Sequence, residues 1–149
     1  MLMRVYVDNS VIGGYFDEEF KESTIKLFGE FEKGFKKAVI SDLTLQELEG
    51  APTHVKEFLT TVKTEMILLD NECIELAKLY IKEKAITPKF FNDALHIATA
   101  TVNRLDVLVS WNFKHIVNLN RIRLYNAVNL KNGYPIIEIR TPIEIIIEK

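Results

Sequence analysis

Four polar residues lie where a strand or a helix would carry their side chains toward one end of a sheet. They are Asp8, Glu47, Asp93 and Asn112. Three of them are carboxylates and the fourth supplies an amide oxygen, and hard divalent cations prefer oxygen ligands of this kind. The residue types and their positions together predict a cation site.

Two of these residues follow apolar runs that are typical of buried strands. Asp8 ends the run 3–7, and Asn112 ends the run 107–111. Ligand crevices of open parallel sheets lie at the carboxyl ends of the strands. If the two runs are neighbouring parallel strands, Asp8 and Asn112 arrive at the same edge and face each other.

The other two acids are expected on helices. On a helix that begins near Asp42, with about 100° per residue, Glu47 lies within roughly 60° of the centre of the apolar arc, whereas Glu49 points away. An ionised carboxylate turned toward apolar surroundings is costly unless it is paired or bound to a metal, so Glu47 should have a partner. Asp93 lies on a similar apolar line of a later helix, and His96, one turn further on, is expected on its polar side.

Each residue also has a purely structural interpretation. An Asp after a strand commonly caps a helix, a Glu on a helix shoulder commonly forms a salt bridge, and Asn112 could cap residues 113–117. His96 and His115 are expected to be structural hydrogen-bonding residues rather than metal ligands. The coincidence of residue type and position favours the joint cation site.

The elements that must position these residues alternate between strands and helices, which predicts an α/β sheet. Glycine, proline and capping residues mark the boundaries. The predicted strands are 3–7, 38–40, 65–69, 107–111 and 136–140. The predicted helices are 17–34, one from Ser41 or Asp42, one from Pro52 to about Lys63, one capped by Asn71, one after Pro88 that runs through Phe91 and Val102, and 119–131. The tail 142–147 is ambiguous between an edge strand and a helix.

Length and composition limit the class of protein. A chain of 149 residues, 48% hydrophobic and 27% charged, fits a single soluble globular domain. The amino terminus lacks the regions of a signal peptide, and no apolar stretch approaches the roughly 18 residues of a membrane span. A cytoplasmic location with no membrane partner is expected. The single cysteine, Cys73, excludes an internal disulfide and is expected in a packing or surface role.

The segment that follows the last predicted site strand is basic. Residues 111–135 contain Lys114, Arg121, Arg123 and Lys131 and no acidic residue. Such a segment is a candidate phosphate-facing patch, although four cations also suit a solvated face. Trp111 could stack on a base, but its place in an apolar strand favours a core position.

Four blocks of the sequence contain the candidate site residues. The blocks are VYVDNSVIG at 5–13, SDLTLQEL at 41–48, DALHIATA at 93–100 and LVSWNFKHI at 108–116. In their order and separations they resemble the blocks of PIN-domain proteins, in particular VapC-like toxins. The resemblance covers nearly the whole chain as one domain, 1–149.

This resemblance implies a three-layer α/β/α sandwich on a parallel sheet of about five strands, in the order 3-2-1-4-5. It also implies an acidic pocket that binds Mg²⁺ or Mn²⁺ and cleaves RNA, with Asp8, Glu47 and Asp93 at the family's acidic positions. Asp8 and Asp93 would be direct ligands, and Glu47 and Asn112 direct or water-mediated ones. Ser10 would hydrogen-bond Asp8 or a bound water. An antitoxin protein and a second copy of the chain, in a homodimer, are the partners that the resemblance implies.

The chain departs from the family at Asn112, where an Asp is usual. The neutral amide lowers the negative charge of the site and could weaken cation binding. The alternative function is therefore a PIN-fold RNA-binding or protein-binding module with weakened catalysis. Other sheet enzymes fit less well, because Ser10 stands where a dehalogenase-like phosphatase needs a second acid, and the sequence has no Gly-rich phosphate-binding loop.

Overall fold

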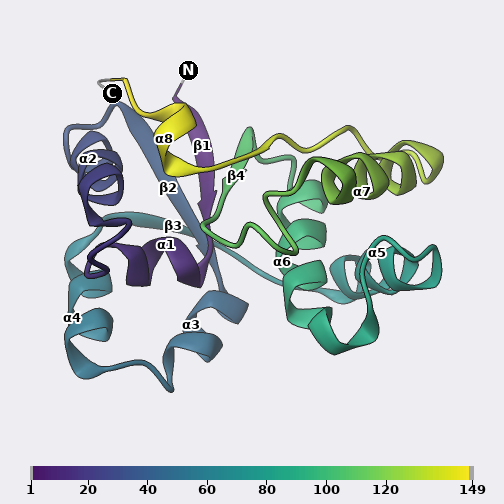
Figure 1. Cartoon of the computed structure of the whole chain (residues 1–149), viewed down its shortest axis with the longest axis horizontal. Helices are drawn as coiled ribbons and strands as arrows, with labels where there is room; N and C mark the ends of the chain where they lie inside the picture. The colour runs from purple at the N-terminus through teal and green to yellow at the C-terminus, as the bar shows by residue number, and fades with distance from the viewer. Residues whose placement is uncertain (1, 148–149) are drawn as a thin grey trace.

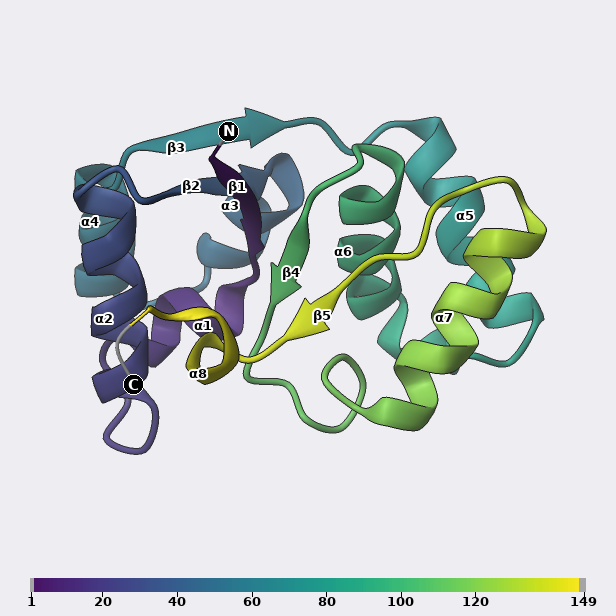
Figure 2. The same ribbon diagram turned by 90° about the horizontal axis from the view of Figure 1, so that it is seen from above.

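Residues 2–147 are described by the computed structural model of the chain, and they form one five-stranded sheet. Its strand order is β3-β2-β1-β4-β5, and all four neighbouring pairs are parallel. Figure 2 shows this order from above. The expected parallel sheet and its order are confirmed. The strands are β1 (Met3–Val7), β2 (Lys36–Ser41), β3 (Thr64–Ile67), β4 (Val107–Val109) and β5 (Ile139–Arg140).

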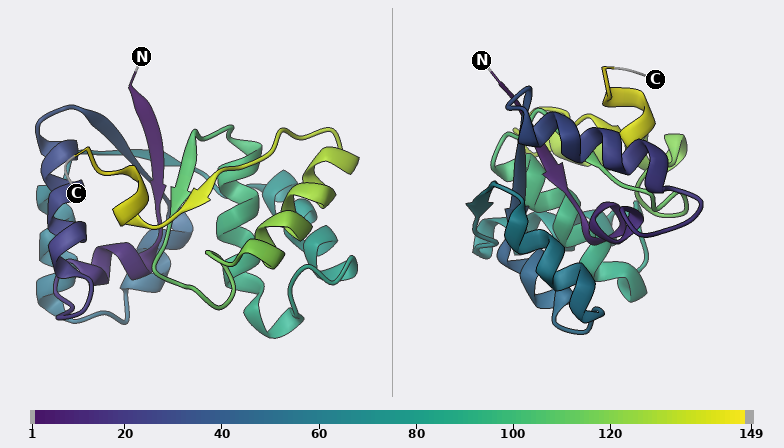
Figure 3. Two further views of the ribbon diagram at one scale, coloured as in Figure 1. Left: turned by 45° about the horizontal axis from the view of Figure 1, so that its top comes forward. Right: turned by 90° about the vertical axis from the view of Figure 1, so that its left-hand side faces the viewer.

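Helices cover both faces of the sheet, which confirms the three-layer sandwich (Figure 1). One layer contains α1 (Asn9–Gly14), α2 (Lys21–Glu32) and α4 (Thr53–Thr61), and the other contains α5 (Asn71–Lys82), α6 (Phe91–Val102) and α7 (Leu119–Lys131). The short α3 (Asp42–Leu48) follows β2, the 3₁₀ turn η1 (Pro88–Phe90) precedes α6, and α8 (Pro142–Ile145) lies against α2 (Figure 3).

Two apolar cores lie on either side of the sheet because strand side chains alternate between its faces. Val5 and Val7 of β1 pack with the α1, α2 and α4 residues. Tyr6, between them, packs with the α5, α6 and α7 residues. Tyr6 is fully buried, so its hydroxyl needs a partner inside the protein. That partner belongs to the site described below.

Side-chain caps begin α1, α3 and α5. Ser41 is the N-cap of α3 and forms a capping box with Thr44, as the sequence suggested. Asp8 is the N-cap of α1 and accepts from the Val11 N–H. Asp70 caps α5, so the prediction that Asn71 is the cap was wrong by one residue, because the Asp70 side chain accepts from the Cys73 N–H. Cys73 is a free, buried thiol that packs in the core.

Other boundaries also differ from the prediction, most of all in the last strands. β4 ends at Val109, and β5 spans only Ile139–Arg140, because pairing with the neighbouring strand stops there. The ambiguous tail forms α8, in which Thr141 and Glu144 make a capping box. The Ile147 N–H then bonds to Glu30, which also pairs with the buried Lys36. Within residues 2–147, no helix combines the length and apolar character of a membrane span.

Candidate functional site

The candidate site lies at the carboxyl ends of β1 and β4. Val7 pairs with Val109 in parallel register, so the next residues, Asp8 and Ser110, leave the sheet side by side. Glu47 comes from α3, which follows the neighbouring β2, and Asp93 comes from the first turn of α6. The strand order therefore delivers residues that are distant in sequence to one edge of the sheet.

Asp8 is enclosed by hydroxyl groups. Ser10 donates to Oδ1 and Ser110 donates to Oδ2, each at 2.6 Å, and the Val11 N–H donates to Oδ1 at 3.2 Å. The side chain is 4% exposed. Burial raises the pKa of the Asp8 carboxyl, and the charge of His96 and the serine hydroxyls oppose that rise. The predicted contact between Ser10 and Asp8 is present.

Both serines also tie Asp8 to the segment after β4. The Trp111 N–H donates to Ser10 Oγ at 2.9 Å, and the Asn112 N–H donates to Ser110 Oγ at 2.9 Å. Each hydroxyl thus accepts from the backbone and donates to the carboxylate. The sequence analysis did not select Ser110. The signal in the sequence that could have identified Ser110 is a hydroxyl residue at the end of the strand that pairs with β1.

Glu47 has a buried partner on α6. Its Oε1 lies 2.5 Å from Nε2 of His96, and Asn92 Nδ2 lies 3.5 Å from its Oε2. The expectation that this carboxylate needs a partner is confirmed. The expectation that His96 lies on the polar side of its helix was wrong, because His96 is 2% exposed and packs beneath Glu47 and Tyr6. Its role as a structural hydrogen-bonding residue is confirmed.

Asn112 bridges a turn and the third acid. Its Oδ1 accepts from the N–H groups of Lys114 and His115 at 3.2 and 3.0 Å, and its Nδ2 lies 3.4 Å from Asp93 Oδ2. Because backbone N–H groups only donate, the amide oxygen must face the turn. Asn112 therefore presents an N–H donor to Asp93, in addition to capping the turn that follows.

Asp93 faces the charges of the other two acids. Burial raises the pKa of its carboxyl, His96 opposes the rise, and Asp8 and Glu47 raise it further. Like charges that share a site disfavour each other's ionised form. The three predicted acids are therefore brought within electrostatic reach of one another.

The donor set fits a hard divalent cation in chemical type. It offers three carboxylates, and Asp93 has only one long contact within the site, to Asn112. Within residues 2–147, however, no three His, Cys, Asp or Glu side chains form a ready metal-binding group. Magnesium keeps several water ligands and is commonly bound by only one or two carboxylates, so it does not need a group of three. Asp8 and Asp93 would hold the ion, and Glu47 would contact it directly or through water.

The predicted basic residues divide into two sets. Lys114 is exposed, and Arg121 is half-buried and donates to the Ala85 carbonyl at 2.8 Å. Burial first, and then the charges of Arg121 and Lys114, lower the pKa of His115, so both cations lie near that ring. Arg123 is two residues beyond Arg121, or about 200° around α7, and points elsewhere. The structure brings Lys114 and Arg121 together but not Arg123.

Aromatic and basic side chains that the sequence analysis did not select border the acids. A hollow of about 300 Å³ is lined by Lys89, Phe90, Phe91, Asn92 and Asp93. Nζ of Lys89 lies 5.7 Å from the centre of the Phe90 ring, and Phe90 stacks on His115 at 3.7 Å between ring centres. This hollow gives Asp93 an open approach with a cation and a ring beside it.

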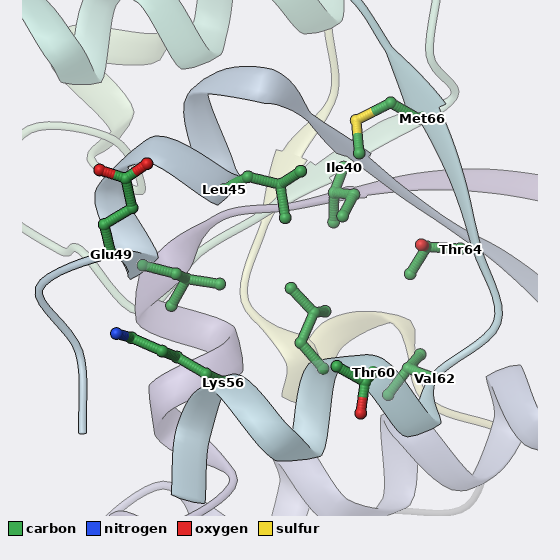
Figure 4. Close-up of a pocket in the computed structure, with 10 residues that line it drawn as sticks. Ile40, Leu45, Glu49, Lys56, Thr60, Val62, Thr64 and Met66 are labelled. Atoms are coloured by element: carbon green, nitrogen blue, oxygen red, sulfur yellow. The ribbon is translucent and has the colours of Figure 1, made fainter. Parts of the chain in front are cut away.

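An apolar hollow of about 420 Å³ lies elsewhere. It is bounded by the edge of the sheet and the helices α3 and α4 (Figure 4). Leu45 and Met66 line it, with Glu49 and Lys56 at one end. Glu49 and Glu47 thus diverge, as their predicted positions around the helix required. Only Glu47 reaches the acidic site.

No family model and no curated protein matches the chain. Support for a function therefore has to come from the side chains of this site and from their chemistry.

Proposed function

We propose that this chain is an endoribonuclease that depends on Mg²⁺ or Mn²⁺ and hydrolyses RNA phosphodiester bonds. The observation that carries the proposal is the position of Asp93, which faces the charges of both Asp8 and Glu47 at the carboxyl edge of a parallel sheet. Two carboxylates that raise the pKa of a third, as Asp8 and Glu47 do for Asp93, mark a natural site for a divalent cation. The resemblance of the four sequence blocks to PIN-domain proteins supports the same function.

The chain's own residues have distinct roles in this reaction. When bound, the ion would activate a water molecule, orient the scissile phosphate and neutralise developing charge. Asp8, held by Ser10 and Ser110, provides a fixed carboxylate. Asp93 provides a carboxylate that opens onto the hollow beside η1. Glu47 provides the third acid, and the chemistry needs no covalent bond between enzyme and substrate.

The surroundings of the acids suit a nucleic-acid strand. Lys114 and Lys89 are exposed and could pair with phosphates on either side of the scissile bond. Phe113, directly after Asn112, is 51% exposed. Cations that track a backbone and rings that stack on bases are the usual features of single-strand binding. Binding should weaken as the salt concentration rises, because phosphate neutralisation releases counterions.

Cleavage of a labelled single-stranded RNA tests this proposal. The purified protein is incubated with RNA and Mg²⁺ or Mn²⁺, and parallel reactions contain EDTA or the Asp8→Asn variant. Cutting that needs the metal and is lost in Asp8→Asn is the expected result. If the wild-type protein neither cuts RNA nor binds a divalent cation by calorimetry, the nuclease proposal fails.

A second candidate function follows from Asn112. Its Nδ2 donates toward Asp93 and so gives that acid a neutral partner in the place of a fourth carboxylate. This contact favours a PIN-fold module that binds RNA or protein with weakened catalysis. The Asn112→Asp variant separates the two functions. A weakened nuclease should cut faster with this change, whereas a binding module should gain no activity.

The biological setting that we propose is that of a toxin with a cognate antitoxin. The toxin role, the antitoxin partner and a homodimer rest on the sequence resemblance alone. Co-expression of the chain with candidate antitoxins, scored by growth and by co-purification, tests this setting. Unimpaired growth of cells that make the wild-type protein without any antitoxin would argue against a toxin.

A further inference from the structure

A buried hydrogen-bonded chain links Glu47 to the interior of the protein. Nε2 of His96 lies 2.5 Å from Glu47 Oε1, Nδ1 lies 2.6 Å from the Tyr6 hydroxyl, and that hydroxyl lies 2.8 Å from Ser41 Oγ. Tyr6 and Ser41 are fully buried, and His96 nearly so. These four residues come from β1, the end of β2, α3 and α6, so the chain crosses the centre of the fold.

The acceptors fix the direction of this chain. A carboxylate oxygen only accepts a hydrogen bond, so Nε2 of His96 donates in the contact with Glu47. Burial raises the pKa of the Tyr6 hydroxyl, so the phenol keeps its one proton and can donate it to Nδ1. The Tyr6 oxygen then accepts from the Ser41 hydroxyl. Every donor in this series of hydrogen bonds then has one acceptor. The series begins at Ser41, the N-cap of α3, and ends at Glu47 in the same helix.

Glu47 needs this support more than the other acids do. Asp8 is fixed by two hydroxyls and a backbone N–H, whereas the Glu47 side chain is 26% exposed and has three side-chain torsions to restrain. Its contact with Asn92 is longer, at 3.5 Å. The bond to His96 is therefore the contact that sets where the carboxylate lies.

His96 cannot act as a metal ligand in this arrangement, because both of its ring nitrogens are engaged. It also stands one turn after Asp93 on α6. One helical turn thus carries an acid of the site and the group that orients another acid.

We propose that His96 is a positioning residue, which holds the Glu47 carboxylate toward the cation site through its Nε2–H and is itself held by Tyr6. This inference rests on the proposed metal-dependent function. Hydrogen-bond partners of metal-binding carboxylates are commonly worth about 10- to 100-fold in metal affinity. Loss of the His96 bond should therefore weaken cation binding without removing any ligand.

A double-mutant cycle on Mn²⁺ affinity tests whether His96 acts through Glu47. Free Mn²⁺ is measured by electron paramagnetic resonance for the wild type, His96→Leu, Glu47→Gln and the double variant. We expect His96→Leu to bind Mn²⁺ about 10- to 100-fold more weakly in the wild-type background and to have little effect in the Glu47→Gln background. Equal losses in both backgrounds would mean that His96 only supports the fold, and the proposal would be overturned.

Two further variants control for folding. His96→Gln keeps an N–H donor near the position of Nε2, and it should restore Mn²⁺ binding to within about threefold of the wild type. Tyr6→Phe removes only the hydroxyl that orients the ring, and it should give a smaller loss than His96→Leu. If His96→Leu does not fold, the same cycle with Tyr6→Phe and Glu47→Gln replaces it.

Nitrogen-15 NMR of the imidazole provides a readout that does not depend on metal or activity. We expect a proton on Nε2 of His96 in the metal-free wild type, and an unprotonated Nε2 would overturn the inference. If the wild type binds no Mn²⁺ and cuts no RNA, the proposed function fails, whereas the NMR result still decides whether His96 holds Glu47. If the wild type binds Mn²⁺ and the cycle is additive, the function stands and the positioning role fails.

Discussion

Two aromatic rings separated by one residue, Trp111 and Phe113, have different surroundings. Trp111 is 6% exposed, stacks on Phe20 at 4.4 Å between ring centres, and donates from Nε1 to Thr24 Oγ1 at 2.9 Å. Phe113 is only tilted against these rings and is half exposed. The expectation that Trp111 belongs to the core is confirmed, and the ring that is available to a base is Phe113.

Alanine substitutions should separate the two rings. Trp111→Ala should lower the free energy of unfolding by about 3–5 kcal/mol, because it leaves a large cavity and an unpaired Thr24. Phe113→Ala should change stability by less than about 1 kcal/mol, yet lose a stacking contact worth about 1–3 kcal/mol in binding single-stranded RNA. Denaturant unfolding and RNA binding in EDTA measure these effects. Equal RNA affinity of Phe113→Ala and the wild type would exclude stacking on this ring.

Asn112 shows why residue type alone did not settle its role. The sequence analysis offered both a ligand and a cap, and the backbone N–H groups of Lys114 and His115 turn its oxygen toward the cap. No sequence pattern reveals this orientation, because it depends on where the following turn places two amides. The result is an N–H donor, instead of an oxygen, beside Asp93.

An Asp at position 112 should therefore make stability depend on the cation. Asn112→Asp keeps the oxygen that caps the turn. It replaces Nδ2 of Asn112, which lies 3.4 Å from Asp93 Oδ2, with a second carboxylate oxygen. We expect the free energy of unfolding of the metal-free variant to be lower than that of the wild type by roughly 1–3 kcal/mol at pH 8. This loss is smaller than the ~4 kcal/mol of repulsion between two unit charges 4 Å apart at an effective dielectric constant of ~20. Urea unfolding in EDTA measures this loss, and Mn²⁺ should reverse it. A loss of equal size with and without Mn²⁺ would show that the site does not bind the cation.

At the scale of elements, hydrophobic period and punctuation predicted the strands and most of the helices, whereas the order of the strands in the sheet was predicted from the resemblance to PIN-domain proteins. The α3 helix was predicted with Ser41 or Asp42 as its cap, because either residue before an apolar helical pattern can cap a helix, and the structure has Ser41. The α1 helix was not predicted, since Asn9–Gly14 is too short for a period and ends in two glycines. The β5 strand was predicted too long, because pairing partners, not the apolar run itself, decide where a strand ends.

The second of those glycines has a packing role. A Cβ on Gly14 would lie 2.8 Å from Nε1 of Trp111 and 3.1 Å from Thr24 Oγ1, which is closer than normal contact, whereas a Cβ on Gly13 would meet nothing within 4 Å. The end of α1 therefore approaches the Trp111 ring closely because residue 14 has no side chain. This approach helps to fix the segment that carries Ser110 and Asn112.

Alanine at the two positions should have opposite effects. Gly14→Ala should destabilise the fold by about 1–3 kcal/mol through overpacking against Trp111. Gly13→Ala is the matched control and should stabilise it by about 0.5–1 kcal/mol, because alanine favours the helix. Thermal and denaturant unfolding of both variants provide the comparison. Equal effects of the two changes would mean that α1 does not pack on the ring as described.

At the scale of the whole molecule, parallel topology explains why four residues could be predicted to meet. Strand order alone sends Asp8 and Asn112 to one edge, and it places the helices that bear Glu47 and Asp93 beside them. The partners of the acids were harder to predict. Ser110, His96 and the Tyr6 hydroxyl act through distances of 2.5–2.6 Å across elements. Such contacts depend on rotamers and helix rotation, which residue spacing does not specify.

The acids also link the stability of the whole molecule to pH. The folded-state pKa values of Asp8 and Asp93 are raised, in both cases first by burial. Between the ordinary and the raised pKa the folded state binds more protons than the unfolded state, so these groups make the metal-free protein less stable as pH rises. Each group contributes a slope of at most about 1.4 kcal/mol per pH unit in that window.

Asp8→Asn isolates this linkage. It removes the ionisable group at position 8 and also relieves Asp93 of one neighbouring charge, while Asn can still accept from Ser10 and the Val11 N–H. In EDTA, we expect the stability of Asp8→Asn relative to the wild type to increase from pH 4 upward and to level off above the raised pKa. Saturating Mn²⁺ at neutral pH should make the wild type more stable than Asp8→Asn, because the ion stabilises only the protein that binds it. Urea unfolding across this pH range measures the difference, and parallel curves for the two proteins would show that Asp8 ionises in the folded state as it does in the unfolded chain.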